Sequence, residues 1–287
     1  MTASGSERRA ARRMRRRSRL PTILGVAGLV IVGALVFTAV LAPWLAPYDP
    51  TDRIARPFLP PSAEHLLGTN DVGHDLLSEI IYGSRVSLLV GLVAATVALL
   101  IGTSVGVVAG YYPKRLGSTL MRGVDVILIL PFLPLLIVLA AYLGRSLLNT
   151  ILVIGLLIWA EPARIIRSQV LSLRSREYVL AARSMGAPDR WTILRHIVPR
   201  TALLATGSFV RAVSGAILLE AALSFLGLGD PIQKSWGSTL YWAQTRGAFL
   251  TPAWKWWVLP PGLLIMLASL GFALIAFSLE ERINPRL

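Results

Sequence analysis

Two ionisable side chains, Arg211 and Glu220, interrupt an apolar run that extends from about residue 202 to residue 226. A charge at the centre of a bilayer costs about 2.5–3.5 kcal/mol on insertion scales, so such residues face protein or a water-filled cavity. Nine helical positions give about 13 Å of rise and opposite faces, so the two side chains are not expected to pair with each other. Two interpretations stay open. The side chains line a polar translocation path, or they make structural contacts, with Arg211 snorkelling or pairing between helices and Glu220 hydrogen-bonded near the outer helix end.

The sequence offers no residue set for catalysis or for a metal centre. It has no cysteine, which excludes disulfides, iron–sulfur clusters and thiolate zinc sites. Its histidines, His65, His74 and His196, fall in two different loops without the spacing of zinc ligands. The phosphate-binding pattern G-x-x-x-x-G-K-[ST] is also absent. We therefore expect no catalytic residue, no metal and no cofactor on this chain.

A polar segment before the run at 202–226 has the pattern of a helical hairpin. One face of its first helix carries residues at spacings of three and four: Tyr178, Ala181, Ala182 and Met185. Gly186 supplies a stop, because glycine adopts a left-handed conformation at little cost. Pro188 and Asp189 suit the start of a second helix, which Pro199 is expected to end. From these residues alone, the face either docks into a groove of another protein or forms an amphipathic connector on the membrane surface.

The hairpin resembles a known family motif. Leu180-Ala181-Ala182 is followed after three residues by Gly186 and after nine more by His196-Ile197-Val198-Pro199. This arrangement is similar to the EAA loop of the membrane subunits of binding-protein-dependent ABC importers, whose pattern is E-A-A, three residues, G, nine residues and I-x-L-P. Leu180, His196 and Val198 depart from it, whereas the alanines, the glycine and the proline keep their spacing. Tyr178 and the R-H-I-x-P ending resemble the dipeptide/oligopeptide permease branch.

Further motifs are similar to those of the C-type membrane subunit of that branch, and the resemblance covers about residues 20–287. They are HLLGTN at 65–70, GHD at 73–75, GSR at 83–85, SL at 87–88, EAALSFLGLG at 220–229 and NPR at 284–286. The usual form has aspartate at Asn70 and arginine at His74, and these two departures bear on fine specificity.

The resemblance implies an all-α integral membrane protein with the type I ABC importer membrane-subunit fold and a role in ATP-driven peptide import. The implied partners are a homologous second membrane subunit, two ATPase subunits or domains that hold ATP and magnesium, and an extracytoplasmic solute-binding protein. The hairpin would then be a coupling helix seated in a groove of the ATPase subunit. Its implied coupling residues are Glu177, Tyr178, Ala181, Ala182, Arg183, Gly186 and Pro199. Similar permeases carry heme, nickel or glutathione, so the cargo stays open.

Six apolar runs are candidates for membrane spans, at about 21–46, 86–110, 125–143, 147–160, 202–226 and 258–279. A crossing needs about 20 residues, although tilted or broken helices change that length. The first run exceeds the core of a cleavable signal peptide, about 7–15 residues, so we favour a retained helix. Glycines four apart in the second run predict close helix packing: Gly102, Gly106 and Gly110.

Composition and charge place these spans in a bilayer. The chain is 54% hydrophobic and 15% charged, and a soluble domain usually carries about a quarter charged residues. Its net charge of +14 comes largely from arginine clusters at 8–19 and 164–200, which flank apolar runs as the positive-inside rule requires and argue against a nucleic-acid partner.

The predicted organisation is a basic cytoplasmic tail at 1–20 and a permease domain at 21–287, with both termini on the cytoplasmic side of a bacterial cytoplasmic membrane. The domain has an external loop at 43–85 and a cytoplasmic coupling region at 161–200. An ion-coupled secondary transporter or channel would carry charge relays in several spans, whereas only the fifth span holds two central charges. A membrane-embedded enzyme would need clustered catalytic groups, which the sequence lacks.

Overall fold

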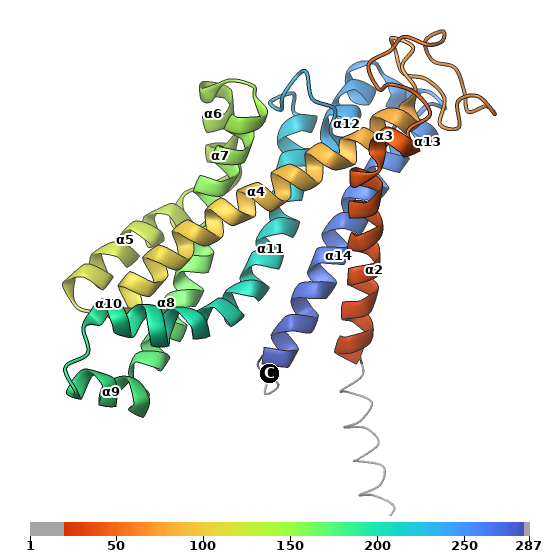
Figure 1. Ribbon diagram of the computed structural model, residues 1–287. Coiled ribbons are helices and arrows are strands. Elements are labelled where there is room, and N and C mark those ends of the chain that lie inside the picture. The colour runs from red at the N-terminus through yellow and green to blue at the C-terminus, as the bar shows by residue number, and fades with distance from the viewer. Residues whose placement is uncertain (1–19, 284–287) are drawn as a thin grey trace, which may run out of the picture.

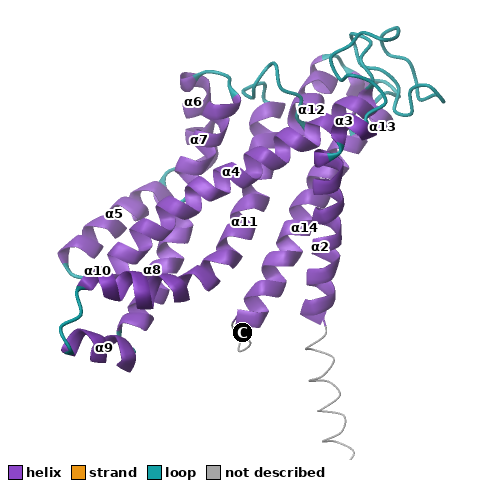
Figure 2. Cartoon of the chain, in the orientation of Figure 1, coloured by secondary structure: helices purple, strands orange, loops and turns teal. Residues whose placement is uncertain are grey.

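Long apolar helices make up most of the described chain, residues 20–283 of this computed structural model (Figures 1 and 2). The predicted tail, apart from Leu20, and the closing NPR motif lie outside the described residues. The elements are α2 (Leu20–Val40), α3 (Ala42–Leu45), α4 (Leu76–Tyr111), α5 (Arg115–Ile129), α6 (Phe132–Leu143), α7 (Leu147–Ile158), α8 (Ala160–Arg174), α9 (Glu177–Ser184), α10 (Asp189–Thr192), the π-helical η1 (Ile193–Ile197), α11 (Val198–Phe225), α12 (Trp236–Thr245), the 3₁₀ turn η2 (Ala248–Leu250), α13 (Trp254–Trp257) and α14 (Leu259–Ile283). Within residues 20–283 no strand forms.

The spans consist of continuous helices and bent helix pairs. Four segments are long and apolar enough to cross a membrane: Leu20–Val40, Leu76–Tyr111, Ala205–Phe225 and Trp254–Glu281. Two further pairs, α5 with α6 and α7 with α8, are bent by 89° and 40°, and they bring the number to six if each pair is one span. The predicted all-α membrane fold with about six spans is confirmed on this count.

The third span is broken at a proline. Pro131 is the N-cap of α6, and Leu130 before it is extended, with ψ of 141°. A residue that precedes proline is disfavoured in the α region, because the proline ring clashes with its backbone and Cβ. The run predicted as one span at about 125–143 is therefore two helices at nearly a right angle, and the first of them already begins at Arg115.

The predicted external loop at 43–85 is too long at its C-terminal end. Helix α4 begins at Leu76, because the side chain of Asp75 accepts a hydrogen bond from the backbone N–H of Ser78 at 2.8 Å and caps the helix. Its 36 residues correspond to about 54 Å of length, against about 30 Å of hydrocarbon. In Figure 1 the helix accordingly runs obliquely from the end near α12 and α13, past α11, to the end near α5 and α8.

The segment between α3 and α4 is held to the long helices by a polar network around Glu79, which is 3% exposed. Its Oε1 accepts hydrogen bonds from Asn70 Nδ2 at 3.0 Å and from Lys234 Nζ at 2.6 Å, and it lies 3.3 Å from His74 Nδ1. The two residues that depart from the usual family form, Asn70 and His74, therefore both contact the same buried carboxylate.

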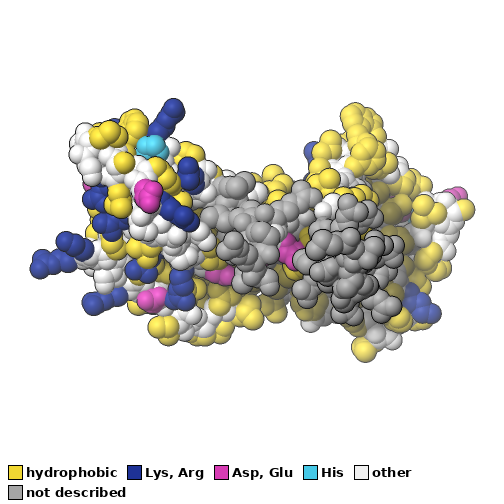
Figure 3. All heavy atoms as spheres, turned by 90° about the horizontal axis from the view of Figure 1, so that it is seen from below, with side chains coloured by type: hydrophobic (Ala, Val, Ile, Leu, Met, Phe, Trp, Pro, Cys, Tyr) yellow, Lys and Arg dark blue, Asp and Glu magenta, His cyan; other side chains and the backbone are white. Residues whose placement is uncertain are grey.

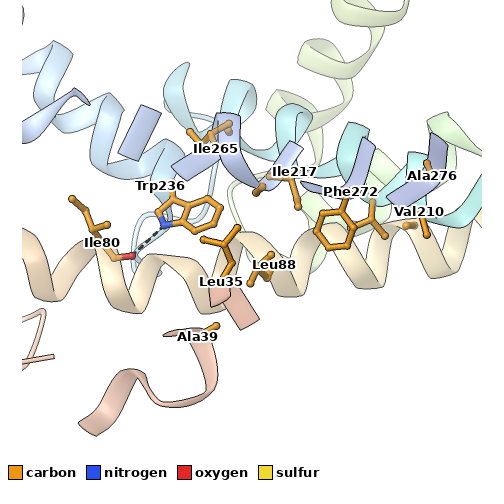
Figure 4. Packing of buried hydrophobic residues seen from close by; sticks show 14 residues of the cluster. Leu35, Ala39, Ile80, Leu88, Val210, Ile217, Trp236, Ile265, Phe272 and Ala276 are labelled. Atoms are coloured by element: carbon orange, nitrogen blue, oxygen red, sulfur yellow. Dashed lines mark hydrogen bonds between the residues drawn. The ribbon is translucent and has the colours of Figure 1, made fainter. Parts of the chain in front are cut away.

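The largest buried cluster joins α2, α4, α11, α12 and α14 (Figure 4). Trp236 is fully buried there, and its indole N–H donates to the backbone oxygen of Ile80 at 3.1 Å. Leu35 of α2, Ile217 of α11 and Phe272 of α14 pack in the same cluster. A tryptophan from the short helix α12 thus fixes α4 against the three other long helices.

A second contact joins α4 to α8 along a glycine stripe. A Cβ at Gly102 would lie 2.8 Å from the Trp159 carbonyl oxygen, and one at Gly106 would lie 2.7 Å from that of Ala163. At Gly110 the nearest atom would be Cβ of Val170, at 2.6 Å. These distances leave no room for a side chain, so the two backbones approach directly.

This contact also corrects the predicted coupling region at 161–200. Residues 160–174 form α8, which continues the fourth span and buries Ala163, Ile166 and Val170. The predicted start at residue 161 is therefore too early, and the hairpin itself begins at Glu177.

We predict that Gly106→Ala destabilises the chain by about 1–3 kcal/mol, because the added Cβ meets backbone that has no room to move aside. Gly123→Ala in α5 is the matched control, since no atom lies within 4 Å of its Cβ position. Helix propensity should make that control neutral or slightly stabilising. Thermal unfolding of both purified variants in detergent checks this, and equal melting temperatures would contradict the close α4–α8 contact.

Candidate functional site

The hairpin turn is formed by a left-handed glycine, as predicted. Gly186 has φ of +84° and follows α9. Its N–H donates to the Arg183 carbonyl at 3.0 Å, and the Ala187 N–H donates to the Ala182 carbonyl at 3.1 Å. These two bonds form a Schellman motif, which satisfies carbonyls at the helix end. No atom lies within 4 Å of the Cβ position of Gly186, so the turn needs glycine for its backbone alone.

The expectation that Pro199 ends the second helix is wrong. Helix α10 begins at Asp189 as predicted, but α10, η1 and α11 follow one another without a break up to Phe225. The π turn ends where the N–H of Val198 reaches back to the carbonyl of Ile193. Pro199 lies in the first turn of α11, where a missing N–H is tolerated. The hairpin is thus continuous with the fifth span.

The predicted docking face is divided between two sides of α9. Ala182 is only 4% exposed and packs inward beside Val179, so it cannot itself contact a partner. Tyr178 is half-buried, with the guanidinium of Arg200 lying 4.2 Å from its ring centroid. The face open to a partner carries Glu177, Leu180, Ala181, Arg183, Met185 and Gly186. Shared helical spacing identified neighbours on α9 but not which of them the rest of the protein covers.

Basic and apolar side chains share the outer surface of the hairpin. Figure 3 shows Lys and Arg side chains gathered over the part of the lower face that α8, α9 and α10 form. Among them stand large exposed apolar side chains: Leu180, Met185, Trp191 and Leu194. Met185, at the turn, is 81% exposed. Such a mixed surface is suited to binding a protein groove with an acidic rim.

A joint between the hairpin and α4 was not predicted from the sequence. Asp189 accepts hydrogen bonds from the hydroxyls of Tyr111 at 2.7 Å and Tyr112 at 3.0 Å. Donation from Tyr111 is the main reason that the pKa of Asp189 is lowered. Both bonds are therefore strongest above that lowered pKa and weaken as the pH falls through it. The signal in the sequence was a Tyr-Tyr pair that ends the second span, but only a helix-start role had been assigned to Asp189.

The two charges of the fifth span have separate partners. Arg211 pairs with Glu280 of α14, and its side chain is 44% exposed. Glu220 is 2% exposed and accepts hydrogen bonds from the hydroxyls of Ser224 at 2.7 Å and Ser87 at 3.0 Å. These contacts favour the structural interpretation for Glu220. Arg211 joins two helices and also lines a cavity between α8 and α11.

Among residues 20–283, no three His, Asp or Glu side chains come together in an arrangement for a metal ion. The geometry provides a hairpin that protrudes from one end of the helix bundle, with joints to α4 and α11 and no reactive centre on it.

Residues 102–287 match the family described as the binding-protein-dependent transport system inner membrane component. The chain belongs to this family. Its helical architecture is therefore that of a type I ABC importer membrane subunit, as predicted. Residues 8–61 also match the family described as the N-terminal TM domain of oligopeptide transport permease C.

Similar proteins cover nearly the whole chain. A di/tripeptide transport system permease protein of Pseudomonas aeruginosa (strain UCBPP-PA14) is 38% identical over 271 residues, which is 91% of this chain and 88% of the relative. A putative peptide transport system permease protein of Brucella suis is 41% identical, over 97% of this chain and 91% of the relative. A dipeptide transport system permease protein of Alkalihalophilus pseudofirmus is 37% identical, over 92% and 86%.

We predict that Gly186→Ala loosens the hairpin, because a left-handed L-residue costs about 1–2 kcal/mol. Hydrogen–deuterium exchange of residues 177–187 should rise accordingly. Gly186→Asn is the matched control, since asparagine tolerates the left-handed region better, and its exchange should rise less. Equal exchange in both variants and the wild type would show that the stability of the turn does not depend on glycine in the left-handed conformation at this position.

Proposed function

We propose that this chain is the C-type membrane subunit of an ATP-driven importer of short peptides in a bacterial cytoplasmic membrane. Membership of the inner membrane component family supports the transporter class. The names of the relatives favour peptides over heme, nickel or glutathione as cargo. The observation that carries the mechanism is the exposed hairpin α9–α10, joined rigidly to two membrane helices.

The proposed complex contains this chain, a homologous second membrane subunit, two ATPase subunits or domains and an extracytoplasmic solute-binding protein. ATP and magnesium are held by the ATPase subunits, and this chain contributes no catalytic group. The hairpin sits in a groove on the ATPase subunit through the face around Met185. The basic residues around it support the docking by their charge.

In this mechanism, closure of the ATPase pair moves the hairpin, and the hairpin moves the spans. Two connections support such a transfer. The helix that begins at Asp189 continues without interruption into α11, so the displacement passes along the helix axis. The carboxylate of the same residue is bonded to Tyr111 and Tyr112 at the end of α4. A shift of α4 and α11 against their neighbours would alternate access to the path.

The orientation that we propose places the hairpin and both termini in the cytoplasm. Helix α2 begins and α14 ends at the same end of the bundle as α9 and α10 (Figure 1). The segment between α3 and α4 lies at the opposite end, with α12 and α13 (Figure 1). The basic residues of the hairpin support a cytoplasmic position through the positive-inside rule.

ATP hydrolysis by the reconstituted complex tests this function. Peptide-loaded binding protein should stimulate hydrolysis, and Met185→Glu should lower both the stimulation and peptide uptake by about tenfold, which corresponds to about 1.4 kcal/mol of docking energy. Met185→Leu, which keeps an apolar side chain at this exposed position, should behave as the wild type. If no peptide stimulates ATP hydrolysis by the wild-type complex, the proposed cargo is wrong. If an assembled Met185→Glu complex couples hydrolysis to uptake normally, the proposed docking face is wrong.

The joint to α4 makes a separate prediction. Asp189→Asn and Tyr112→Phe should each lower the number of peptides transported per ATP hydrolysed, because the hairpin then moves without carrying α4 along. Stimulated hydrolysis itself should be kept, since the exposed docking face is unchanged. Tyr142→Phe, a change to an 88% exposed tyrosine of α6, is the control. Unchanged transport per ATP in the two joint variants would exclude this connection from the mechanism.

A further inference from the structure

A cavity of about 150 Å³ lies between α8 and α11. Its polar lining consists of Glu161, Ser208 and Arg211, and the other side chains around it are apolar. Arg211 lies near the centre of the 28-residue helix α11, with about 20 Å of helix on either side. Glu161 follows the 40° bend between α7 and α8 and lies near the centre of that helix pair. Arg211 also pairs with Glu280, close to the end of the span Trp254–Glu281, so the cavity lies within the spans but toward the end of the bundle at which α14 finishes.

The hydroxyl of Ser208 has no hydrogen-bond partner, although the residue is only 4% exposed. Several other helical serines and threonines donate to a carbonyl three or four residues back, as Thr206 does to Ala202 at 3.1 Å. A buried polar group without a partner costs about 1–3 kcal/mol. Ser208 thus lines the cavity with a hydroxyl whose hydrogen-bonding capacity is unused.

The charges around the cavity are unequal. Arg211 is neutralised by its ion pair with Glu280. Glu161 is exposed and forms no ion pair with any residue between 20 and 283. A carboxylate at this depth cannot face hydrocarbon without a large cost, so it faces water or another polar group. The cavity consequently has the electrostatic character of one free carboxylate beside a free hydroxyl, which suits a cationic group that also carries hydrogen-bonding atoms.

We propose that the α8–α11 cavity is a subsite of the translocation path that takes the amino terminus of the transported peptide. The carboxylate of Glu161 pairs with the terminal ammonium, and the hydroxyl of Ser208 hydrogen-bonds the adjoining peptide group. The volume admits the end of a peptide rather than a whole oligopeptide. The subsite holds its guest weakly, because a path must release what it binds. This assignment rests on the proposed peptide-import function and moves the path away from the fully buried Glu220.

Single-cysteine labelling tests the subsite. Since the chain has no cysteine, Ser208→Cys adds the one thiol of this subunit, and its labelling is measured on the separated chain after reaction of the whole reconstituted complex. A trimethylammonium-bearing methanethiosulfonate should react about tenfold faster than a sulfonate-bearing one, because the local carboxylate concentrates cations. Adding Glu161→Gln should remove that preference, and saturating peptide during turnover should slow the labelling.

Ser269→Cys is the matched control. Its hydroxyl is also buried without a partner, but it lies on α14 outside the cavity, so it should stay unlabelled. If Ser208→Cys is labelled no faster than this control, the proposed subsite is wrong. This holds whether the second membrane subunit or tight packing blocks access to the cavity. A charge preference that persists with Glu161→Gln would overturn the role of the carboxylate.

Transport separates failure of the subsite from failure of the proposed function. Glu161→Gln should lower peptide uptake while hydrolysis stimulated by the peptide-loaded binding protein is kept. If the wild type responds to peptides and Glu161→Gln transports them equally well, the subsite is wrong and the importer function stands. If the wild type shows no peptide response, the proposed cargo fails, and with it the peptide terminus as the guest.

Discussion

The close approach of other helices to α4 is the constraint on which the rest of this structure depends. Within a bilayer, apolar side chains gain little by leaving lipid, so helices associate through van der Waals contact and hydrogen bonds. Helix α4 makes such contact possible by carrying glycine along its length. Gly102 and Gly106 admit the backbone of α8, while Gly91, whose Cβ would lie 2.5 Å from a side-chain carbon of Ile217, admits α11. The two helices that carry the hairpin are both positioned on this one surface.

Polar groups within the bundle serve as fixed joints between the same helices. Glu220 of α11 is bonded to Ser87 of α4 near the end of the bundle that carries α12, and Arg211 of α11 is paired with Glu280 of α14 nearer the opposite end. A carboxylate or guanidinium within the membrane-spanning bundle costs free energy unless it is paired. Both of these side chains are paired with residues from distant parts of the chain. Glu161 differs from them because none of the ion pairs formed among residues 20–283 includes it, and this is the reason for proposing a guest there.

The same two helices, α8 and α11, connect the hairpin to the cavity. Helix α11 extends from the π turn beside the hairpin, past Ser208 and Arg211, to Glu220. Helix α8 extends from the cavity beside Glu161 to the start of α9. The hairpin thus follows α8 and precedes α11 along the chain, and these are the helices that enclose the cavity. Under the proposed function, movement of the hairpin on ATPase closure would reach the proposed peptide site through these two helices.

The sequence by itself determined the helical membrane class, the number of spans, the left-handed turn at Gly186 and the family, because apolar run length, glycine conformation and motif spacing are local properties. Helix limits were harder to predict: the cap at Asp75 lengthened α4, and Pro199 was absorbed into the first turn of α11 after a π turn. Only the tertiary structure decided which residues meet. It turned Ala182 inward, bonded Asp189 to Tyr111 and Tyr112, gave Arg211 and Glu220 different partners and brought Glu161 to Ser208. These contacts join residues on different helices, and the spacing along one helix carries no information about the helix that will pack against it.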